Sequence, residues 1–312
     1  MDSLVLSGSK SLENRTGFAV AIEEFLRSQD VKPSSRSTYR RELRAFFSWL
    51  DQDGAEKPVD EDVLRFKRSL EERGLSSLTI TNYLVAVRKF FAWTETKGYY
   101  PNVAKTVKGA KRTKGFRKDP LTVEQVKDLL AEIDRTTLEG RRDYALLNLF
   151  VRTGLRTVEV IRANVEDIRQ QGGDSLLYIQ GKGRDAKDDF VLLTEATLRP
   201  IREYIASRKA VKDGEPLFAS LSNKNKGERL TTRSLRRIIK DRLRGIEIED
   251  KRITAHSLRH TAITLSLLGG ASIQEAQILA RHADINTTLV YAHNINRVTN
   301  APERRIDTML DA

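Results

Sequence analysis

Cysteine is absent from this sequence, histidine is scarce and long apolar runs are missing. Without cysteine the chain can form neither a disulfide nor a thiolate metal site, which fits an intracellular protein. Its four histidines are scattered, and this argues against a structural zinc site. No apolar run approaches the ~20 residues that would span a bilayer. The opening segment MDSLVLSGSKSLENR also lacks the charged start and apolar stretch of a secretory signal.

Positive charge, in contrast, is present in excess. The chain has 55 Lys and Arg against 43 Asp and Glu, which gives a net charge of +12 and a pI of about 9.8. Such an excess favours a polyanionic partner, most often nucleic acid, with an anionic membrane surface as the alternative. The length of 312 residues predicts two domains, and the 39% hydrophobic content is ordinary for a protein with a packed core.

A basic segment, KTVKGAKRTKGFRK at residues 105–118, marks the boundary between the two domains. It contains seven Lys or Arg, two glycines and no acidic residue, so it cannot bury itself and is typical of an extended linker. We predict one domain at residues 1–104 and another at residues 119–312. Both flanking segments are basic, which favours a linker that follows DNA over a plain solvated tether. The side chains expected to do so are Lys111, Arg112, Lys114, Arg117 and Lys118.

Apolar residues at helical spacing predict four helices in the first domain. They cover residues 16–28, 35–51, 60–73 and 78–97. The second and fourth share a spacing of aromatic side chains, which could reflect an old duplication or, as we favour, the same packing demand on two helices. We predict that these aromatics form the core and do not stack on bases. The matched positions are Tyr39, Leu43, Arg44, Phe46, Phe47 and Trp49 with Tyr83, Val87, Arg88, Phe90, Phe91 and Trp93.

The polar openings of two of these helices, SSRSTYRR at 34–41 and SSLTITN at 76–82, predict contacts with DNA. Helix N-termini attract phosphate through their free N–H groups, although N-capping alone would explain the serines and threonines. The guanidinium groups tilt the balance toward DNA. The candidates in the first domain are Arg36, Arg40, Arg41, Arg44, Thr79, Asn82 and Arg88, and those in the second are Thr232, Arg233, Arg236 and Arg237.

The second domain alternates between helical patterns and one predicted β-hairpin. Thr122 and Gln125 have the spacing of a capping box, and Gly154 interrupts an apolar helix at 141–153. Residues 175–193 alternate as a hairpin with a charged, glycine-containing loop. Further helices are predicted at 196–210, 231–244, 256–268, 272–282 and, as a short helix, 286–292.

The segment AHSLRHTAIT places His256 and Arg259 three residues apart, on one face of a helix. Two such donors suit an anion such as phosphate, although a solvated helix face with a structural histidine has the same pattern. Arg156 and His282 could bind the same phosphate. Each has an ordinary alternative, and that of Arg156 is an ion pair with Glu159.

Two further residues could take part in chemistry at such a phosphate. Lys182 lies between two glycines at the predicted hairpin tip and could reach a leaving oxygen, although most such lysines are surface residues. Tyr291 could supply a nucleophilic phenol, although one of eight tyrosines could equally belong to the core.

Taken together, these segments resemble the tyrosine recombinases, also called phage integrases, over nearly the whole chain. TGLRTVEV is similar to the first arginine box, IQGKGRDAKDDFVLL to the β-hairpin with its lysine, AHSLRHT to the His-x-x-Arg box and LARHADINTTLVYAH to the final box. One departure is visible, because Arg281 stands where the family usually has glycine. The residues that the resemblance assigns to catalysis are Arg156, Lys182, His256, Arg259, His282 and Tyr291, supported by Glu159 and His260.

The resemblance implies a mainly α fold with a small β-hairpin or sheet. An N-terminal helical, SAM-like core-binding domain would precede a C-terminal mixed α/β catalytic domain. It further implies cleavage and rejoining of duplex DNA at a specific site, through a 3′-phosphotyrosyl intermediate and a Holliday junction, without a metal or cofactor. The implied assembly is a homotetramer in the synaptic complex and a monomer or dimer when free, in the cytoplasm and at the nucleoid of a prokaryote.

The implied chemistry follows from the charge on a phosphodiester. Arg156 and Arg259 would stabilise the non-bridging oxygens of the phosphate with their planar, permanently charged guanidinium groups. A free phenol, with a pKa of about 10, is a weak nucleophile and needs a base or nearby cations. His256 is the expected proton acceptor and Lys182 the donor to the departing 5′ oxygen. His260 is expected to be a structural or buffering residue.

The tail at about residues 293–312 carries a short apolar stripe of Ile306, Met309 and Leu310, preceded by Pro302 as a helix start. In the family such a tail packs on a neighbouring subunit; the alternative is that it folds back on its own domain.

Residues 1–15 are too short for an extra arm-binding domain, which favours an Xer-like or small mobile-element recombinase. A type IB topoisomerase and a non-catalytic DNA-binding relative remain as alternatives. Integration or excision, dimer resolution and inversion are left open.

Overall fold

The computed structural model of the chain describes residues 15–55, 57–110, 119–181, 184–250, 252–299 and 302–310. The chain divides into two compact units, Met1–Gly115 and Phe116–Ala312. The five linker cations predicted to follow DNA, between residues 111 and 118, lie outside the described residues. No described helix is long and apolar enough to cross a membrane.

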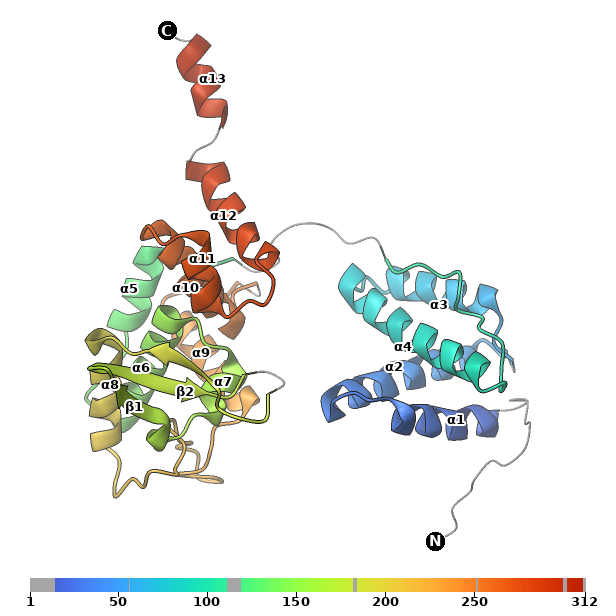
Figure 1. Ribbon diagram of the computed structural model, residues 1–312, viewed down its shortest axis with the longest axis horizontal. Coiled ribbons are helices and arrows are strands. Elements are labelled where there is room, and N and C mark those ends of the chain that lie inside the picture. The colour runs from blue at the N-terminus through green and yellow to red at the C-terminus, as the bar shows by residue number, and fades with distance from the viewer. Residues whose placement is uncertain are drawn as a thin grey trace. The chain divides into compact units, whose positions relative to one another are not determined.

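The first unit is a bundle of helices, and the four predicted ones are confirmed. They are α1 (Arg15–Ser28), α2 (Pro33–Gln52), α3 (Asp60–Glu72) and α4 (Ser77–Thr96) (Figure 1). Pro33 starts α2, where its missing N–H costs no hydrogen bond, and the side chain of Ser76 caps α4 by accepting from the Thr79 N–H.

Aromatic side chains form the centre of this first unit. Phe46, Phe66 and Phe91 are fully buried and meet edge to face, with ring centroids 5.1 Å apart for Phe46 and Phe66 and 6.0 Å for Phe46 and Phe91. The predicted role of the aromatics as core is therefore confirmed. Val107 is also buried in this core, so the ordered unit extends past residue 104, where the sequence placed the boundary.

The second unit is built around α6 (Leu138–Thr153), which is buried on almost every side, as expected for a helix in the middle of a domain. The helix α8 (Glu195–Ala206) packs along α6, and α10 (Ala255–Leu268) packs on it as well. The remaining helices are α5 (Val123–Ala131), α7 (Thr157–Arg162), α9 (Thr232–Gly245), α11 (Ile273–Ala280), α12 (Asn286–Thr299) and α13 (Pro302–Leu310).

A small antiparallel sheet completes the second unit, in the order β1 (Ile168–Gln171), β2 (Asp174–Ile179) and β3 (Asp189–Leu192). The predicted hairpin corresponds to β2 and β3, with Leu177 opposite Val191. The sequence did not predict β1, because IRQQ is short, polar and without alternation. Mainly helical structure with a small sheet confirms the expected fold class.

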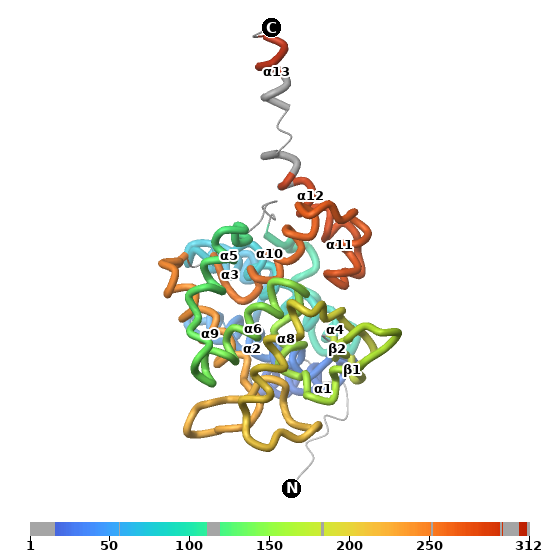
Figure 2. The backbone as a smooth tube through the Cα atoms, turned by 90° about the vertical axis from the view of Figure 1, so that its left-hand side faces the viewer, coloured from blue at the N-terminus to red at the C-terminus, as the bar shows by residue number. Residues whose placement is uncertain are grey.

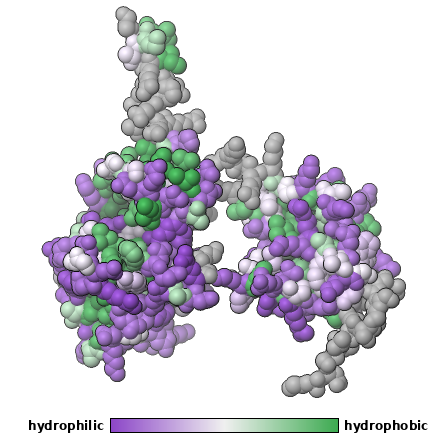
Figure 3. Space-filling model, in the orientation of Figure 1, coloured by the Kyte–Doolittle hydropathy of each residue, from purple (hydrophilic) through white to green (hydrophobic). Residues whose placement is uncertain are grey.

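At one end of this unit, α11 and α12 pack beside α10 (Figure 2). Ile263, Ala276, Ala280 and Tyr291 form a small buried cluster there, separate from the main core. The surface over this end is rich in hydrophobic residues (Figure 3), and exposed apolar side chains in these helices are Leu268, Ile278 and Val290.

Candidate active site in the second unit

Two helices of the second unit end on residues in the left-handed conformation, and both ends face the same site. Gly154 follows α6 with φ +59°, and Arg281 follows α11 with φ +52°. After α11, the Arg281 N–H donates to the Ile278 carbonyl and the His282 N–H to the Gln277 carbonyl, which is the Schellman pattern. Each helix thereby turns away sharply and leaves its last carbonyl oxygens available to other groups.

Those carbonyl oxygens accept hydrogen bonds from the two predicted phosphate-binding arginines. Arg259, only 2% exposed, donates from Nη1 to the Gly154 oxygen at 2.5 Å and from Nη2 to the Ala280 oxygen. Arg156 donates from Nη2 to the Arg281 oxygen at 3.3 Å. Helix C-termini carry partial negative charge, so they stabilise cations in these positions. The alternative of a solvated helix face does not apply to Arg259, which is buried.

The environment of Arg259 is cationic despite these carbonyls. Burial, together with the neighbouring charges of Arg156 and Arg281, lowers the pKa of Arg259 to about 10. The guanidinium still carries its charge at neutral pH. A buried cation flanked by other cations favours the arrival of an anionic ligand.

Glu159 holds Arg156 in place from within the core. Its side chain is fully buried, with Oε1 2.7 Å from Arg156 Nη1 and Oε2 accepting from the Arg156 backbone N–H at 2.7 Å. The ion pair that the sequence offered as an alternative for Arg156 therefore exists. It does not remove Arg156 from the site, because Nη2 of the same fork bonds the Arg281 carbonyl beside Arg259.

The phenol of Tyr291 lies in the small cluster, 5% exposed, and its hydroxyl shares a hydrogen bond with Nδ1 of His260. The ring of His256 meets that of His260 edge-on at 4.7 Å. Burial raises the pKa of Tyr291 to about 12, while Arg259 acts in the opposite direction. His260, expected to be structural or buffering, thus contacts the predicted nucleophile directly. The 31-residue separation gave no sequence signal for this contact.

His282 also lies beside Tyr291, with the two rings stacked and their centroids 6.3 Å apart. A hydrogen bond of 2.9 Å joins its Nδ1 to the hydroxyl of Thr288, which is completely buried. Burial, together with the charges of Arg259 and Arg156, lowers the pKa of His282 to about 4. His282 is therefore neutral near pH 7, which suits a hydrogen-bond donor to phosphate rather than an acid.

The structure thus brings five of the six predicted catalytic residues together, and the sixth, Lys182, lies outside the described residues. At the base of its loop, the Gln180 side chain donates to the Arg184 carbonyl at 2.8 Å. No group of three or more His, Asp or Glu able to hold a metal ion occurs among the described residues.

The predicted DNA-contacting residues of the first unit have different environments. Arg40 is paired with Glu23 at 2.7 Å and Arg36 donates to the Gln29 carbonyl at 3.1 Å, whereas Arg41 and Arg44 are exposed. Thr79 is half-buried and engaged at the start of α4, and Asn82 and Arg88 are exposed.

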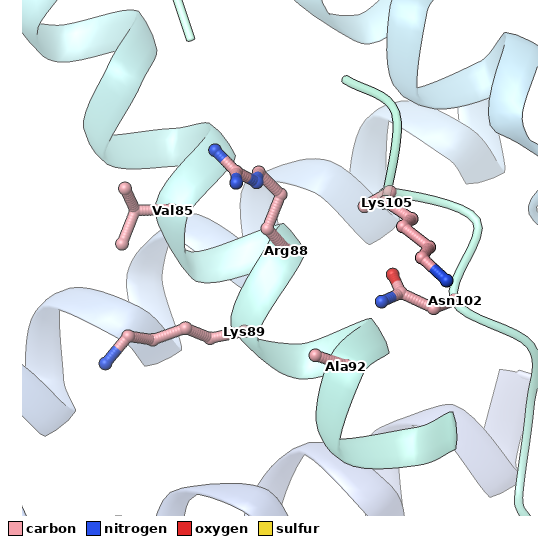
Figure 4. Close-up of a pocket in the computed structure, with 7 residues that line it drawn as sticks. Val85, Arg88, Lys89, Ala92, Asn102 and Lys105 are labelled. Carbon is pink, nitrogen blue, oxygen red and sulfur yellow. The ribbon is translucent and has the colours of Figure 1, made fainter. Parts of the chain in front are cut away.

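Arg88 also lines a hollow of about 400 Å³ in the first unit (Figure 4). Lys89 projects from the same helix, while Asn102 and Lys105 come from the segment that follows α4. Three cations around one hollow form a positive surface. In the second unit, α9 buries Leu235, Ile239 and Leu243 and exposes all four predicted contacts, Thr232, Arg233, Arg236 and Arg237.

Comparison with known proteins places this geometry in a family. A profile of the phage integrase family matches residues 120–297, and a profile of the phage integrase N-terminal SAM-like domain matches residues 22–98. The chain belongs to the phage integrase family. This phage integrase is similar to a tyrosine recombinase of Synechococcus elongatus, with 32% identity over 83% of this chain and 84% of the relative. It also shares 29% identity with XerC of Thermodesulfovibrio yellowstonii, over 82% of this chain and 84% of the relative.

Solved structures have the same fold as this phage integrase. XerH in a post-cleavage complex with a palindromic difH substrate has a TM-score of 0.73 at 20% identity, covering 97% of this chain and all of that one. A lambda integrase dimer bound to a COC′ core site has a TM-score of 0.69 at 16% identity, covering 89% and 95%. The two profile matches confirm the expected SAM-like and catalytic parts, and the Synechococcus relative confirms the tyrosine recombinase family.

Proposed function

We propose that the chain is a site-specific recombinase that cuts and rejoins duplex DNA through Tyr291. The observation that carries the proposal is the position of the Tyr291 hydroxyl. It is bonded to a histidine in a site where two arginines are fixed on helix-terminal carbonyls. A nucleophile, a base and permanently charged donors are the groups needed for attack on a phosphodiester.

In this proposal the Tyr291 oxygen attacks the scissile phosphorus while Arg156, Arg259 and the neutral His282 bond its non-bridging oxygens. The bond between phosphorus and the tyrosine oxygen forms, and the bond to the 5′ oxygen breaks with its electron pair. The leaving oxygen takes a proton from Lys182 and becomes a hydroxyl. A 5′ hydroxyl from a second strand can reverse these steps, so no external energy source is needed for strand exchange.

The phenol proton needs an acceptor, because burial raises the pKa of Tyr291 to about 12. His260 receives it directly along the existing hydrogen bond, and the exposed His256, edge-on to His260, lies next to it. The geometry favours His260 over His256, which the sequence analysis preferred as the first acceptor. His256 remains available as a phosphate donor at the start of α10.

The partner in this proposal is a duplex carrying a specific recombination site. XerH was solved with a difH substrate and lambda integrase with a COC′ core site, and the positive surfaces around Arg88 and along α9 are consistent with such a partner. The five Lys and Arg side chains between residues 111 and 118 would contact phosphates rather than bases. Four copies would assemble on two sites, and the protein would act at the nucleoid, in the cytoplasm of a prokaryote.

The test is to trap the covalent intermediate on a duplex nicked close to the cut, so that the released fragment diffuses away. The parent chain should form a protein–DNA adduct, and Tyr291→Phe should bind the DNA equally well and form none. An adduct from the Phe variant would show that another residue is the nucleophile. Tight binding without any adduct from the parent would favour a non-catalytic relative, and relaxation of plasmids lacking a site would favour a topoisomerase.

A further inference from the structure

Arg281 occupies a backbone position that favours glycine. Its φ of +52° and ψ of +48° are left-handed, and the residue closes the Schellman turn after α11. A β-carbon is disfavoured in this conformation, which is why such positions usually hold glycine or asparagine. A side chain kept there should therefore make interactions that glycine cannot.

The Arg281 side chain turns into the site and is only 9% exposed. Its Nη2 lies 3.0 Å from Glu159 Oε2, and its Nη1 donates to the Leu279 carbonyl at 2.9 Å. Its Nε is buried without a hydrogen-bond partner among the described residues and lies 4.0 Å from the Asp189 carboxylate at the start of β3. Arg281 thus approaches Glu159 at the carboxylate oxygen that the Arg156 fork leaves open.

The buried carboxylate is consequently shared by two guanidinium groups. With glycine at residue 281, Glu159 would offset the charge of one of two arginines. Arg281 adds a third guanidinium beside the buried Glu159 carboxylate, and the partly exposed Asp189 carboxylate, 4.0 Å from its Nε, offsets only part of the added positive charge. Attack on a phosphodiester converts one negative charge into two as the five-coordinate transition state forms, so the added charge acts in the direction of catalysis.

We propose that Arg281 is a positioning residue for DNA cleavage, which holds the Glu159 carboxylate at Oε2, thereby keeps Arg156 oriented, and adds positive charge to the site. The inference rests on the proposed function, because it requires Arg156 to bind the scissile phosphate. Arg281 is buried behind Glu159 and acts through Arg156 rather than through its own contact with DNA.

The first test compares Arg281→Gly and Arg281→Lys with the parent in single-turnover adduct formation at saturating DNA. Arg281→Gly should cut about 10- to 100-fold more slowly, by analogy with the loss of residues that orient the ligands of a metal site. DNA affinity should be unchanged. Arg281→Lys should recover part of the rate because it keeps the charge. Parent-like cutting by Arg281→Gly at saturating DNA would overturn the proposal.

A matched control separates the backbone effect from the charge. Ala210 is another non-glycine residue with a left-handed φ, +46°, and it lies outside the site. Ala210→Gly should therefore relieve the same kind of strain and leave the adduct rate unchanged. Thermal unfolding should show both glycine variants folded, so that slow cutting by Arg281→Gly cannot be attributed to an unfolded protein.

The second test is a double-mutant cycle with Arg156→Lys. If Arg281 acts through Glu159 and Arg156, Arg281→Gly should cost much less in the Arg156→Lys background than in the parent. An equal loss in both backgrounds would mean that Arg281 acts independently, and the positioning role would be rejected.

Imidazole NMR of the free protein gives a readout that does not depend on cutting. The charge of Arg281 is one cause of the low pKa of His282, so Arg281→Gly should raise that pKa and Arg281→Lys should do so less. If the parent formed no adduct, the proposed function would fail, yet this shift would still report on Arg281. An unchanged pKa of His282 in Arg281→Gly would show that Arg281 adds no positive charge to the site, and would contradict the proposal.

Discussion

At the scale of single residues, the site shifts the pKa values of two neighbouring side chains, Tyr291 and His282, in opposite directions. The pKa of Tyr291 is raised to about 12 and that of His282 is lowered to about 4, mainly by burial in both cases. Burial disfavours the charged form, which is the phenolate for tyrosine and the imidazolium for histidine. The nucleophile therefore stays protonated until a base acts on it, while His282 stays neutral beside the arginines.

The contact between Tyr291 and His260 leads to a prediction about the proton acceptor. His260→Gln should slow adduct formation by about 10²- to 10⁴-fold near pH 7, the usual contribution of a positioned base. The deficit should shrink toward pH 10, because hydroxide increasingly replaces the missing base. Single-turnover rates from pH 6 to 10 would measure this. A larger, pH-sensitive loss in His256→Gln, with little loss in His260→Gln, would return the role to His256.

The lowered pKa of His282 predicts acid sensitivity of the fold. Because the ordinary histidine value is 6.5, the unfolded chain binds more protons than the folded chain between about pH 6.5 and 4. Stability should rise with pH across this window and be lost as the pH falls. The melting temperature of His282→Gln should therefore fall less steeply in acid than that of the parent. The exposed His293 supplies the control, since His293→Gln should retain the parental slope.

The sequence identified the reacting residues but not what holds them. Arg259 was predicted to bind phosphate from its spacing to His256, and nothing in AHSLRHT indicates the carbonyls of Gly154 and Ala280 that fix its guanidinium. These partners lie 105 and 21 residues away in the chain. Such contacts depend on how the helix ends dock in space, which local spacing does not encode.

At the scale of elements, the site is assembled where helices and a hairpin end. The ends of α6 and α11 supply carbonyl oxygens, the start of α7 supplies Arg156, and the β2–β3 hairpin carries Lys182 in its connection. Each of these groups comes from a different element. Their separate roles are therefore open to single substitutions.

The hairpin prediction concerns the leaving group. Lys182→Ala should slow cleavage of an ordinary strand far more than cleavage of a strand with a 5′-bridging phosphorothiolate, because a sulfur leaving group needs no proton. Trapping both adducts on otherwise identical duplexes would give the two rates. Equal losses on the two substrates would remove Lys182 from the role of general acid.

The helices were predictable because their apolar residues repeat at helical spacing and because capping residues mark several starts. The predicted capping box at Thr122–Gln125 is present, and a second capping box, Ser272–Glu275, starts α11. The last helix of the site was predicted to end at residue 292, yet α12 continues to Thr299. The added segment is polar but contains no glycine or proline, and the first proline after it is Pro302. Because the apolar residues of this segment repeat only weakly and no glycine or proline interrupts it, the sequence did not show where the helix ends.

At the scale of the whole molecule, the tail is the feature that most needs a partner. The helix α13 starts at the predicted Pro302, and the exposed fractions of Ile306, Met309 and Leu310 are 54%, 82% and 79%. An isolated helix of nine residues is marginal in water, so its apolar stripe should dock on another surface. In the tetramer proposed above, a neighbouring subunit would provide that surface.

Truncation after Asn296 tests this coupling between assembly and activity. The shortened protein should bind a single half-site normally but lose cooperative occupancy of the full site, and recombination should fall in parallel. Gel shifts on half and full sites, with recombination measured on the same samples, would give both quantities. Cooperative binding and a parental recombination rate in the truncated protein would show that the tail is not needed for assembly.

Tyr291 packs with Ile263, Ala276 and Ala280 in a cluster apart from the main core. A group held by so few apolar contacts opens at a lower free-energy cost than the domain unfolds, so amide protons in α11 and α12 should exchange before those in α6. Such an opening would separate the phenol from Arg259 and break the bond from Arg259 to Ala280. In the open state the chain would remain folded but could not cut DNA. A bound neighbour that suppresses the opening would raise the fraction able to cut without touching a reacting atom.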